Sequence, residues 1–508
     1  MITFVIAIAV LILGYVVYGR FVERIFGING KRKTPAVTMT DGVDYVPMKP
    51  WRIFLIQFLN IAGIGPICGA IMGAQFGSSS FLWIVFGSIF AGAVHDFMSG
   101  MISVREKGCN LPDIHGKYLG RDMMRFMSGF IVLIVILVGV VFVNTPVTLL
   151  DSHFTPGDNN IFRSIIPDTT HLLHINVDWD IYIWMTIILV YYFIATMLPI
   201  DKLIGKIYPV FGLLLLVMAG ALIVAFIVYK PAIPEVWEGL ENRHPQAAQN
   251  PIFPMMFISI ACGAISGFHA TQSPIMARCI ISERQGRPIF YGAMITEGVV
   301  ALVWAAAAAY FYHDPVLSAA SAGKSGPGMV GFIADTWFTD FSKTLTTITI
   351  LGVISAAITS GDTALRSARL MIADFLHLSQ KPIKNRLIIA VPLFAIVIIG
   401  IVFSIVNKNG FRIVWNYFSW ANQFLAMVTL WAITFYLVVN TKKFQYWLTL
   451  VPATFMTMVT ISFIFVSPSE GLGTILPRPV GYGIAGFLTI VCLTMFFHWK
   501  NKLRKMAA

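Results

Sequence analysis

A few ionisable residues stand inside long apolar stretches of this sequence, where such side chains are rare. His95 and Asp96 are adjacent, Glu297 follows in "MITEGVVAL", and Asp362 lies four residues before Arg366. A charge near the middle of a lipid bilayer costs at least about 2.5 kcal/mol, so such residues tend to face a partner or a water-filled path. The spacing of Asp362 and Arg366 puts them on one helix face, where they can pair. The chemistry that suits these groups is a proton relay or an inner gate; the alternative is a set of salt bridges that hold helix ends.

Four more polar residues extend this set. His269 can titrate near neutral pH or bind a substrate carboxylate, and a structural histidine explains it equally well. Thr359 and Ser360 can offer hydroxyl oxygens to a hard cation such as Na⁺, although hydroxyls in membrane helices more often bond their own backbone. Lys206 is the weakest candidate for the gate, because a lysine that snorkels to the membrane surface explains it as well.

Two stretches carry Gly, Pro and polar residues in the middle of apolar runs: "NIAGIGPICGA" and "ACGAISGFHATQSP". A backbone that leaves the helix in lipid survives only where protein or a cavity surrounds it. Paired interruptions in two halves of a chain point to a transporter site at the midplane, with half-helix amino termini facing a substrate carboxylate. The alternative is close helix packing at Gly and a kink at Pro. The predicted substrate-binding residues at the two breaks are Asn60, Gly63, Gly65, Pro66, Cys68, Gly69, Gly263, Ser266, Gly267 and His269.

The elements that must position these residues are membrane helices. The chain has 508 residues, of which 57% are hydrophobic and 12% charged, and a mean hydropathy of +0.78. This composition predicts an all-α polytopic membrane protein, because about thirteen apolar runs are long enough to cross a bilayer as helices and too long for barrel strands. The runs are expected at residues 2–19, 51–76, 81–104, 126–146, 179–200, 208–229, 254–272, 289–312, 345–365, 387–406, 413–439, 446–467 and 480–499.

The two interrupted runs each open a set of five helices. Because five is odd, the second set enters from the opposite side of the membrane, which predicts a 5+5 inverted repeat. The expected organisation is a first helix and loop at 1–50, one repeat at 51–230, the inverted repeat at 253–440, and two peripheral helices at 441–508. We expect alternating access to occur by rocking of the bundle that contains the two interrupted helices against the rest of the core.

The basic residues fall in alternate loops. If the amino terminus is outside, about 28 of the 36 Lys and Arg residues lie in inward loops, as the positive-inside rule requires. The net charge of +12 is therefore explained by the orientation of the chain in the membrane and by contact with anionic lipid headgroups. The carboxyl terminus is expected to be cytoplasmic, and no nucleic-acid partner is expected.

Enzyme and metal-site motifs are missing from the sequence. It has no HExxH and no CxxC, and its five cysteines are expected to serve packing. We expect no cofactor, no metal and no enzyme activity, so transport must draw on an ion gradient.

Several motifs resemble the carbon starvation protein A family of membrane transporters. They are "TPAVTMTDGVDYVPMKPW", "AGIGPICGAIMGAQFG", "GAVHDFMSGMISVREKG", "FHATQSPIMARC", "TEGVVAL" and "SGDTALRSAR", which follow in order from Thr34 to about Asp374. The resemblance implies uptake of peptides or pyruvate across the bacterial cytoplasmic membrane, with proton coupling, on a leucine-transporter-like fold. It also implies that the functional positions are Gly63, Gly65, Pro66, Asp96, Glu297, Asp362, Thr363 and Arg366.

The sequence thus predicts a secondary active symporter for small organic nutrients. A Na⁺-coupled symporter, a nutrient sensor that binds without transport, and a channel are the alternatives. Substrate, coupling ion, oligomeric state and the order of the buried carboxylates stay open.

Overall fold

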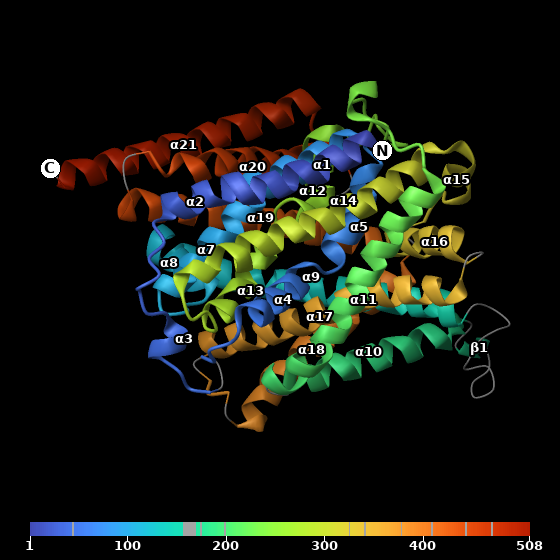
Figure 1. Cartoon of the computed structure of the whole chain (residues 1–508), viewed down its shortest axis with the longest axis horizontal. Coiled ribbons are helices and arrows are strands. Elements are labelled where there is room, and N and C mark those ends of the chain that lie inside the picture. The colour runs from blue at the N-terminus through green and yellow to red at the C-terminus, as the bar shows by residue number, and fades with distance from the viewer. Residues whose placement is uncertain are drawn as a thin grey trace.

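Long helices lying side by side make up the protein (Figure 1). The computed structural model describes residues 1–42, 45–155, 169–172, 175–197, 200–324, 326–339, 342–376, 378–380, 382–407, 410–441, 444–468 and 471–507. The two ends of the chain lie at opposite ends of the bundle. An odd number of membrane crossings requires this arrangement.

Among the described residues, 12 helices are long and apolar enough to cross a membrane, and a bent pair raises the number of spans to 13. The prediction of about thirteen transmembrane helices is confirmed. The bent pair is α4 (Pro50–Ile61) and α5 (Ile64–Ala74), which meet at 47°.

The remaining spans follow in chain order. In the first half they are α1 (Ile2–Leu13) with η1 (Gly14–Tyr18) and α2 (Gly19–Phe26), α6 (Ser79–Gly87) with η2 (Ser88–Gly92) and α7 (Ala93–Arg105), α9 (Arg121–Phe154), α10 (Trp179–Met197) and α11 (Ile200–Tyr229). In the second half they are η5 (Ile252–Met256) with α12 (Phe257–Ile260), η6 (Ala261–Gly263) and α13 (Gly267–Ala277), then η8 (Arg287–Tyr291) with α14 (Gly292–His313), α17 (Lys343–Phe375), α18 (Ile383–Val406), α19 (Gly410–Asn440), α20 (Trp447–Val466) and α21 (Arg478–Ala507).

Short elements connect these spans, and the hydropathy pattern did not predict them. They are α3 (Pro35–Thr38), α8 (Leu111–Leu119), η4 (Val236–Glu238), η7 (Glu283–Gln285), α15 (Pro315–Ala320), α16 (Gly326–Phe338), and the strands β1 (Thr169–Leu172) and β2 (Ile175–Asp178), which pair antiparallel. They are too short or too polar to cross a bilayer.

Burial separates central from peripheral spans. In the most apolar part of the span Glu283–His313, 89% of the residues are buried, against 33% for Ile2–Phe26 and 22% for Arg478–Leu503. The alanines from Ala305 to Ala309 on α14 are fully buried, and such small side chains let neighbouring helices approach closely. The span that contains α14 therefore lies at the centre of the bundle, together with the spans Ser79–Arg105 and Ile252–Ala277, which are 83% and 78% buried.

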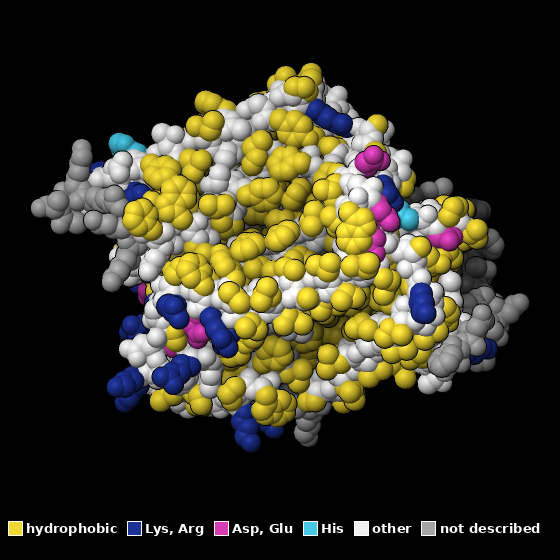
Figure 2. Space-filling model, turned by 45° about the horizontal axis from the view of Figure 1, so that its top comes forward, with side chains coloured by type: hydrophobic (Ala, Val, Ile, Leu, Met, Phe, Trp, Pro, Cys, Tyr) yellow, Lys and Arg dark blue, Asp and Glu magenta, His cyan; other side chains and the backbone are white. Residues whose placement is uncertain are grey.

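The molecular surface fits a membrane setting. Figure 2 shows a broad hydrophobic band, with most Lys and Arg side chains of that face gathered at one end and most Asp and Glu side chains at the other. The asymmetry agrees in direction with the loop charges of the sequence.

Candidate functional site

The first break lies at Ala62 and Gly63, between α4 and α5. The N–H of Gly63 bonds to Ile61 O, so the carbonyl of Leu59 loses its helical partner. The hydroxyls of Thr359 and Ser360 donate to that carbonyl over 3.1 and 3.2 Å. The two predicted cation-site residues on α17 therefore reach the freed carbonyl of the first break.

The second break separates α12, which ends at Ile260, from α13, which begins at Gly267. Polar side chains from neighbouring helices satisfy its backbone. Ser88 Oγ donates to Gly263 O over 3.1 Å, and Gln423 Nε2 donates to Ile265 O over 3.1 Å. These bonds explain how non-helical backbone persists at this depth.

The amino terminus of α13 is held by Asn422 of α19. Asn422 Oδ1 accepts from Phe268 N over 2.8 Å and from Ser266 Oγ over 3.2 Å. A substrate carboxylate that met this helix terminus would have to compete with Asn422.

The glycines of the two breaks allow the interrupted spans to touch. A Cβ at Gly65 would lie 2.4 Å from Cys262 Sγ, and a Cβ at Gly69 would lie 2.9 Å from the carbonyl oxygen of Ile260. A Cβ at Gly267 would lie 2.4 Å from Ala426 N on α19. These glycines therefore have a packing role, and their role in substrate binding stays a prediction.

The remaining predicted residues of the breaks are also buried. Cβ atoms at Gly63 and Gly263 would lie 2.5 Å from Ser360 Oγ and 3.0 Å from Ala301 Cβ. Pro66 lies in the first turn of α5, with Cys68 two residues on, and both are buried. No ligand contact is implied by these positions alone.

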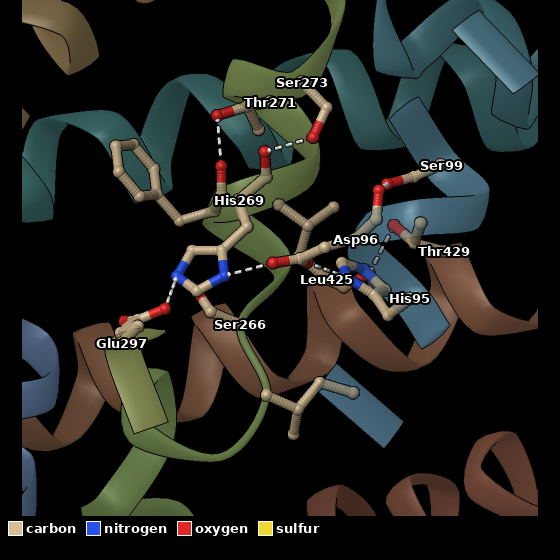
Figure 3. A network of polar contacts seen from close by, with 12 residues as sticks. His95, Asp96, Ser99, Ser266, His269, Thr271, Ser273, Glu297, Leu425 and Thr429 are labelled. Atoms are coloured by element: carbon tan, nitrogen blue, oxygen red, sulfur yellow. Dashed lines mark hydrogen bonds and ion pairs between the residues drawn. The ribbon is translucent and has the colours of Figure 1, made fainter. Parts of the chain in front are cut away.

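Four ionisable side chains from three helices meet beside the second break (Figure 3). His269 Nδ1 lies 2.8 Å from Asp96 Oδ2, and His95 Nδ1 lies 2.7 Å from Asp96 Oδ1. On the other side of the ring, His269 Nε2 lies 3.4 Å from Glu297 Oε2. All four side chains are fully buried, so the sequence candidates on α7, α13 and α14 form one connected cluster.

Proton positions in this cluster follow from its geometry. An ionised Asp96 accepts an Nδ1–H from each histidine, which leaves one proton to be placed between His269 Nε2 and Glu297. On the ring, that proton makes an imidazolium–carboxylate pair; on Glu297, it leaves both groups neutral. Neither carboxyl oxygen of Glu297 has a hydrogen-bond partner among the described residues. No hydrogen bond from another described group therefore favours the charged or the neutral form of Glu297.

Asp362 and Arg366 form a separate site on α17. Their side chains lie 3.4 Å apart, as the spacing predicted, and Arg366 Nη2 donates to Ala195 O of α10 over 2.5 Å. Among the described residues no hydrogen bond or ion pair joins Asp362 to the Asp96 cluster. The side chain of Lys206 lies outside the described residues, so its predicted place near the gate is not described.

Sequence reasoning missed the side chains that hold the breaks together. Asn422 and Gln423 are adjacent polar residues inside the apolar run "SWANQFLAM", and Ser88 lies in η2. Polar residues at depth in a membrane helix were the available signal, but nothing in the sequence indicated which break they face.

In the described parts of the chain, no group of three or more His, Cys, Asp and Glu residues is arranged to hold a metal ion. Among the described residues none of the five cysteines forms a disulfide.

A bundle with up to thirteen spans among the described residues, two of them interrupted, and a buried ionisable cluster beside one interruption define an integral membrane transporter. The chain belongs to the family of the carbon starvation protein CstA, whose model matches residues 1–166, 159–325 and 316–463. The resemblance found in the sequence motifs is confirmed.

Relatives extend over most of the chain. An uncharacterized membrane protein of Haemophilus influenzae is 42% identical over 354 residues, which are 64% of this chain and 95% of that protein. The peptide transporter CstA of Bacillus subtilis is 27% identical over 575 residues, 98% of this chain and 95% of that protein. The pyruvate/proton symporter BtsT of Escherichia coli is 26% identical over 340 residues, 58% of this chain and 47% of that protein.

Solved structures add a likeness in fold. A manganese transporter of Eremococcus coleocola superposes with a TM-score of 0.57 and 15% identity, covering 91% of this chain and 99% of that one. At this identity the likeness concerns the fold alone.

Proposed function

We propose that this protein is a secondary active symporter that imports a small organic nutrient, a peptide or pyruvate, across the bacterial cytoplasmic membrane with protons. The observation that carries the proposal is the fully buried chain Asp96–His269–Glu297. A relative named as a peptide transporter and one named as a pyruvate/proton symporter support the choice of substrates and ion.

The cluster is suited to coupling because it joins helices that would move relative to one another in the proposed transport cycle. It links α7 and α14 to α13, the second half of an interrupted span. A proton gained or lost there changes a charge that buried surroundings cannot screen. It also changes which groups donate and accept between the three helices, and so biases one arrangement of the broken-helix bundle over another.

Sodium coupling is the second candidate, and one observation favours it. Thr359 Oγ1, Ser360 Oγ and Leu59 O converge at the first break, and hard cations prefer such oxygen ligands. In this arrangement both hydroxyls donate to the carbonyl, so a bound Na⁺ would have to replace those two hydrogen bonds.

Uptake into sealed proteoliposomes tests both candidates. Labelled pyruvate and labelled alanylalanine are offered with an imposed proton gradient and, separately, with an imposed sodium gradient. Accumulation driven by the proton gradient alone supports the proposal, and accumulation driven only by sodium moves the coupling site to Thr359 and Ser360. Saturable binding without accumulation of either solute contradicts transport and favours a sensor.

A further inference from the structure

Two amide side chains stand on α4 in the turns that lead into the first break. Gln57 and Asn60 are one turn apart, on the same side of the helix, and both are buried. Neither the oxygen nor the nitrogen of the Gln57 amide has a hydrogen-bond partner among the described residues, and Asn60 Nδ2 has none there either. Leaving a buried polar group unpaired costs roughly 1–3 kcal/mol, so an amide with both atoms unpaired needs an explanation.

A third amide, Gln272 on α13, stands at a similar height. Met48 N donates to Cys279 O over 3.2 Å, so the start of α4 lies beside the end of α13 and the two helices run in opposite directions. Gln57 is seven residues from the first residue of α4 and Gln272 is five residues from the last residue of α13, which at a rise of about 1.5 Å per residue is about 10 Å and about 8 Å along the two helices. They therefore occupy the same level of the bundle.

α17 closes the space between these two helices. Thr363 Oγ1 donates to Asn60 Oδ1 over 2.9 Å, and one turn further along α17 Ser367 Oγ donates to Gln272 Oε1 over 3.4 Å. Gln57 lies about one turn before Asn60 on α4, toward the end of the bundle where α4 begins. The polar groups of α4, α13 and α17 thus form one neighbourhood.

A cavity of about 300 Å³ lies next to Gln272, at the end of the bundle predicted to be cytoplasmic, and its described wall does not include Gln57, Asn60 or Gln272. Its wall includes Thr271 and Ser367, the two residues whose hydroxyls bond Gln272, and Arg278. The volume is at the lower end of the range for small-molecule sites, which suits a solute of the size of a dipeptide.

We infer that Gln57, with Asn60 and Gln272, forms a subsite that binds the peptide group of the transported solute. A primary amide donates and accepts at once, as does a peptide group, whereas pyruvate offers only acceptors. The inference rests on the proposed transport function and makes Gln57 the residue that discriminates between the two substrate classes.

The test pairs a substitution with a changed solute. Gln57→Met keeps the length of the side chain and removes its donor and acceptor. The probes are alanylalanine and its ester analogue alanyl-lactate, in which an ester oxygen replaces the peptide N–H. The dissociation constant of each probe is measured by the rise in unfolding temperature of the purified protein with ligand concentration.

Wild-type protein is expected to bind alanylalanine about tenfold more tightly than alanyl-lactate, and Gln57→Met is expected to bind the two alike. A variant that only disturbed the fold would weaken both probes and keep their ratio. Gln445→Met, the same change in the loop before α20, serves as the matched control and should keep the wild-type ratio.

Three results overturn the inference. The first is an unchanged ratio in Gln57→Met, and the second is wild-type protein that binds the two probes equally. The third is wild-type protein that binds and accumulates pyruvate but neither probe, which leaves the proposed symport intact and removes only the peptide subsite. Failure of the proposed function differs from all of these, because then no solute accumulates with either ion gradient.

Discussion

Glu283 begins the membrane span Glu283–His313 and Glu297 lies inside it, and both side chains are fully buried, yet their surroundings differ. Glu283 accepts hydrogen bonds from Arg32 Nη1 (3.0 Å), Arg105 Nε (3.2 Å) and the N–H of Asn29 (2.8 Å). Glu297 Oε2 lies 3.4 Å from His269 Nε2, and within the described structure neither of its oxygens has a hydrogen-bond partner.

The two carboxyl groups differ in whether their partners can change charge. Guanidinium groups stay protonated at any physiological pH, so the two arginines are permanently charged partners of Glu283, and they clamp the end of α7 to η7 and to the loop after α2. A histidine can lose or gain its proton near neutral pH, so the charge of Glu297 is tied to that of its neighbour. The two sites predict opposite results when they are altered.

His269→Ala should have the largest effect on transport. Its removal takes away the ring that bonds Asp96 on one side and faces Glu297 on the other, and leaves two buried carboxyl groups without it. We expect uptake into proteoliposomes to fall at least about a hundredfold, a loss equivalent to about 2.7 kcal/mol. His498→Ala, on the exposed face of α21, is the control that should keep wild-type uptake.

If His269→Ala does not fold, His269→Gln provides a second variant, because an amide can still bond to Asp96. Gradient-driven uptake at the wild-type rate by either folded variant would remove His269 from the coupling site.

Glu297→Gln should separate exchange from accumulation. The amide keeps the size of the side chain but cannot carry the proton, so net uptake driven by a proton gradient should be lost while exchange of labelled for unlabelled solute continues. Both are measured in the same vesicles, with the unfolding temperature as a check on folding.

Glu106→Gln is the matched control. Glu106 follows the last residue of α7, and its carboxylate pairs with Lys117 of α8. Proton-driven accumulation by Glu297→Gln would place the exchangeable proton elsewhere, with Asp96 and Asp362 the next candidates.

Glu283→Gln should give the reverse pattern. Removing one partner of a buried ion pair leaves the other charges uncompensated, at a typical cost of about 3 kcal/mol. The free energy of unfolding in detergent should fall by about that amount, while the protein that remains folded accumulates solute with the same dependence on the proton gradient. Loss of gradient dependence without loss of stability would contradict the distinction between the two glutamates.

The sequence predicted local features well and contacts between helices poorly. The two breaks follow from Gly and Pro within apolar runs, and the Asp362–Arg366 pair follows from a spacing of one helix turn. Asp96, His269 and Glu297 were each recognised because charges and histidines are rare at depth. Their assembly around one imidazole ring depends on how three helices pack, which no spacing along the chain records.

Glu283 shows the limit most clearly. It lies in a short polar stretch that the sequence indicates only as an inward loop, and its partners come from positions about 180 and 250 residues away. Gln57 and Gln272 were missed for a related reason, because uncharged amides in an apolar run stand out less than charges do. Both cases depend on tertiary contacts, which a hydropathy pattern does not contain.

Glu235 is the carboxyl group for which we expect the smallest effect. Like Glu283 it accepts several hydrogen bonds, but it lies in the loop after α11. Burial alone would raise the pKa of this carboxyl, but hydrogen bonds from the Met1 amino group and from Thr3 and Ile2 lower its pKa from 4.5 to about 2. A lowered pKa in the folded state gives stability that is present above about pH 4.5 and is lost as the pH falls toward about 2. At pH 6 the wild type should therefore be more stable than Glu235→Gln by at most about 1 kcal/mol, as for other ion pairs near water.

Thermal unfolding at pH 6, 4 and 3 should show this difference in stability shrinking. Glu241→Gln, at an exposed position of the same loop, should show no difference from the wild type. A difference that stays constant with pH would mean that Glu235 acts through packing and not through its charge.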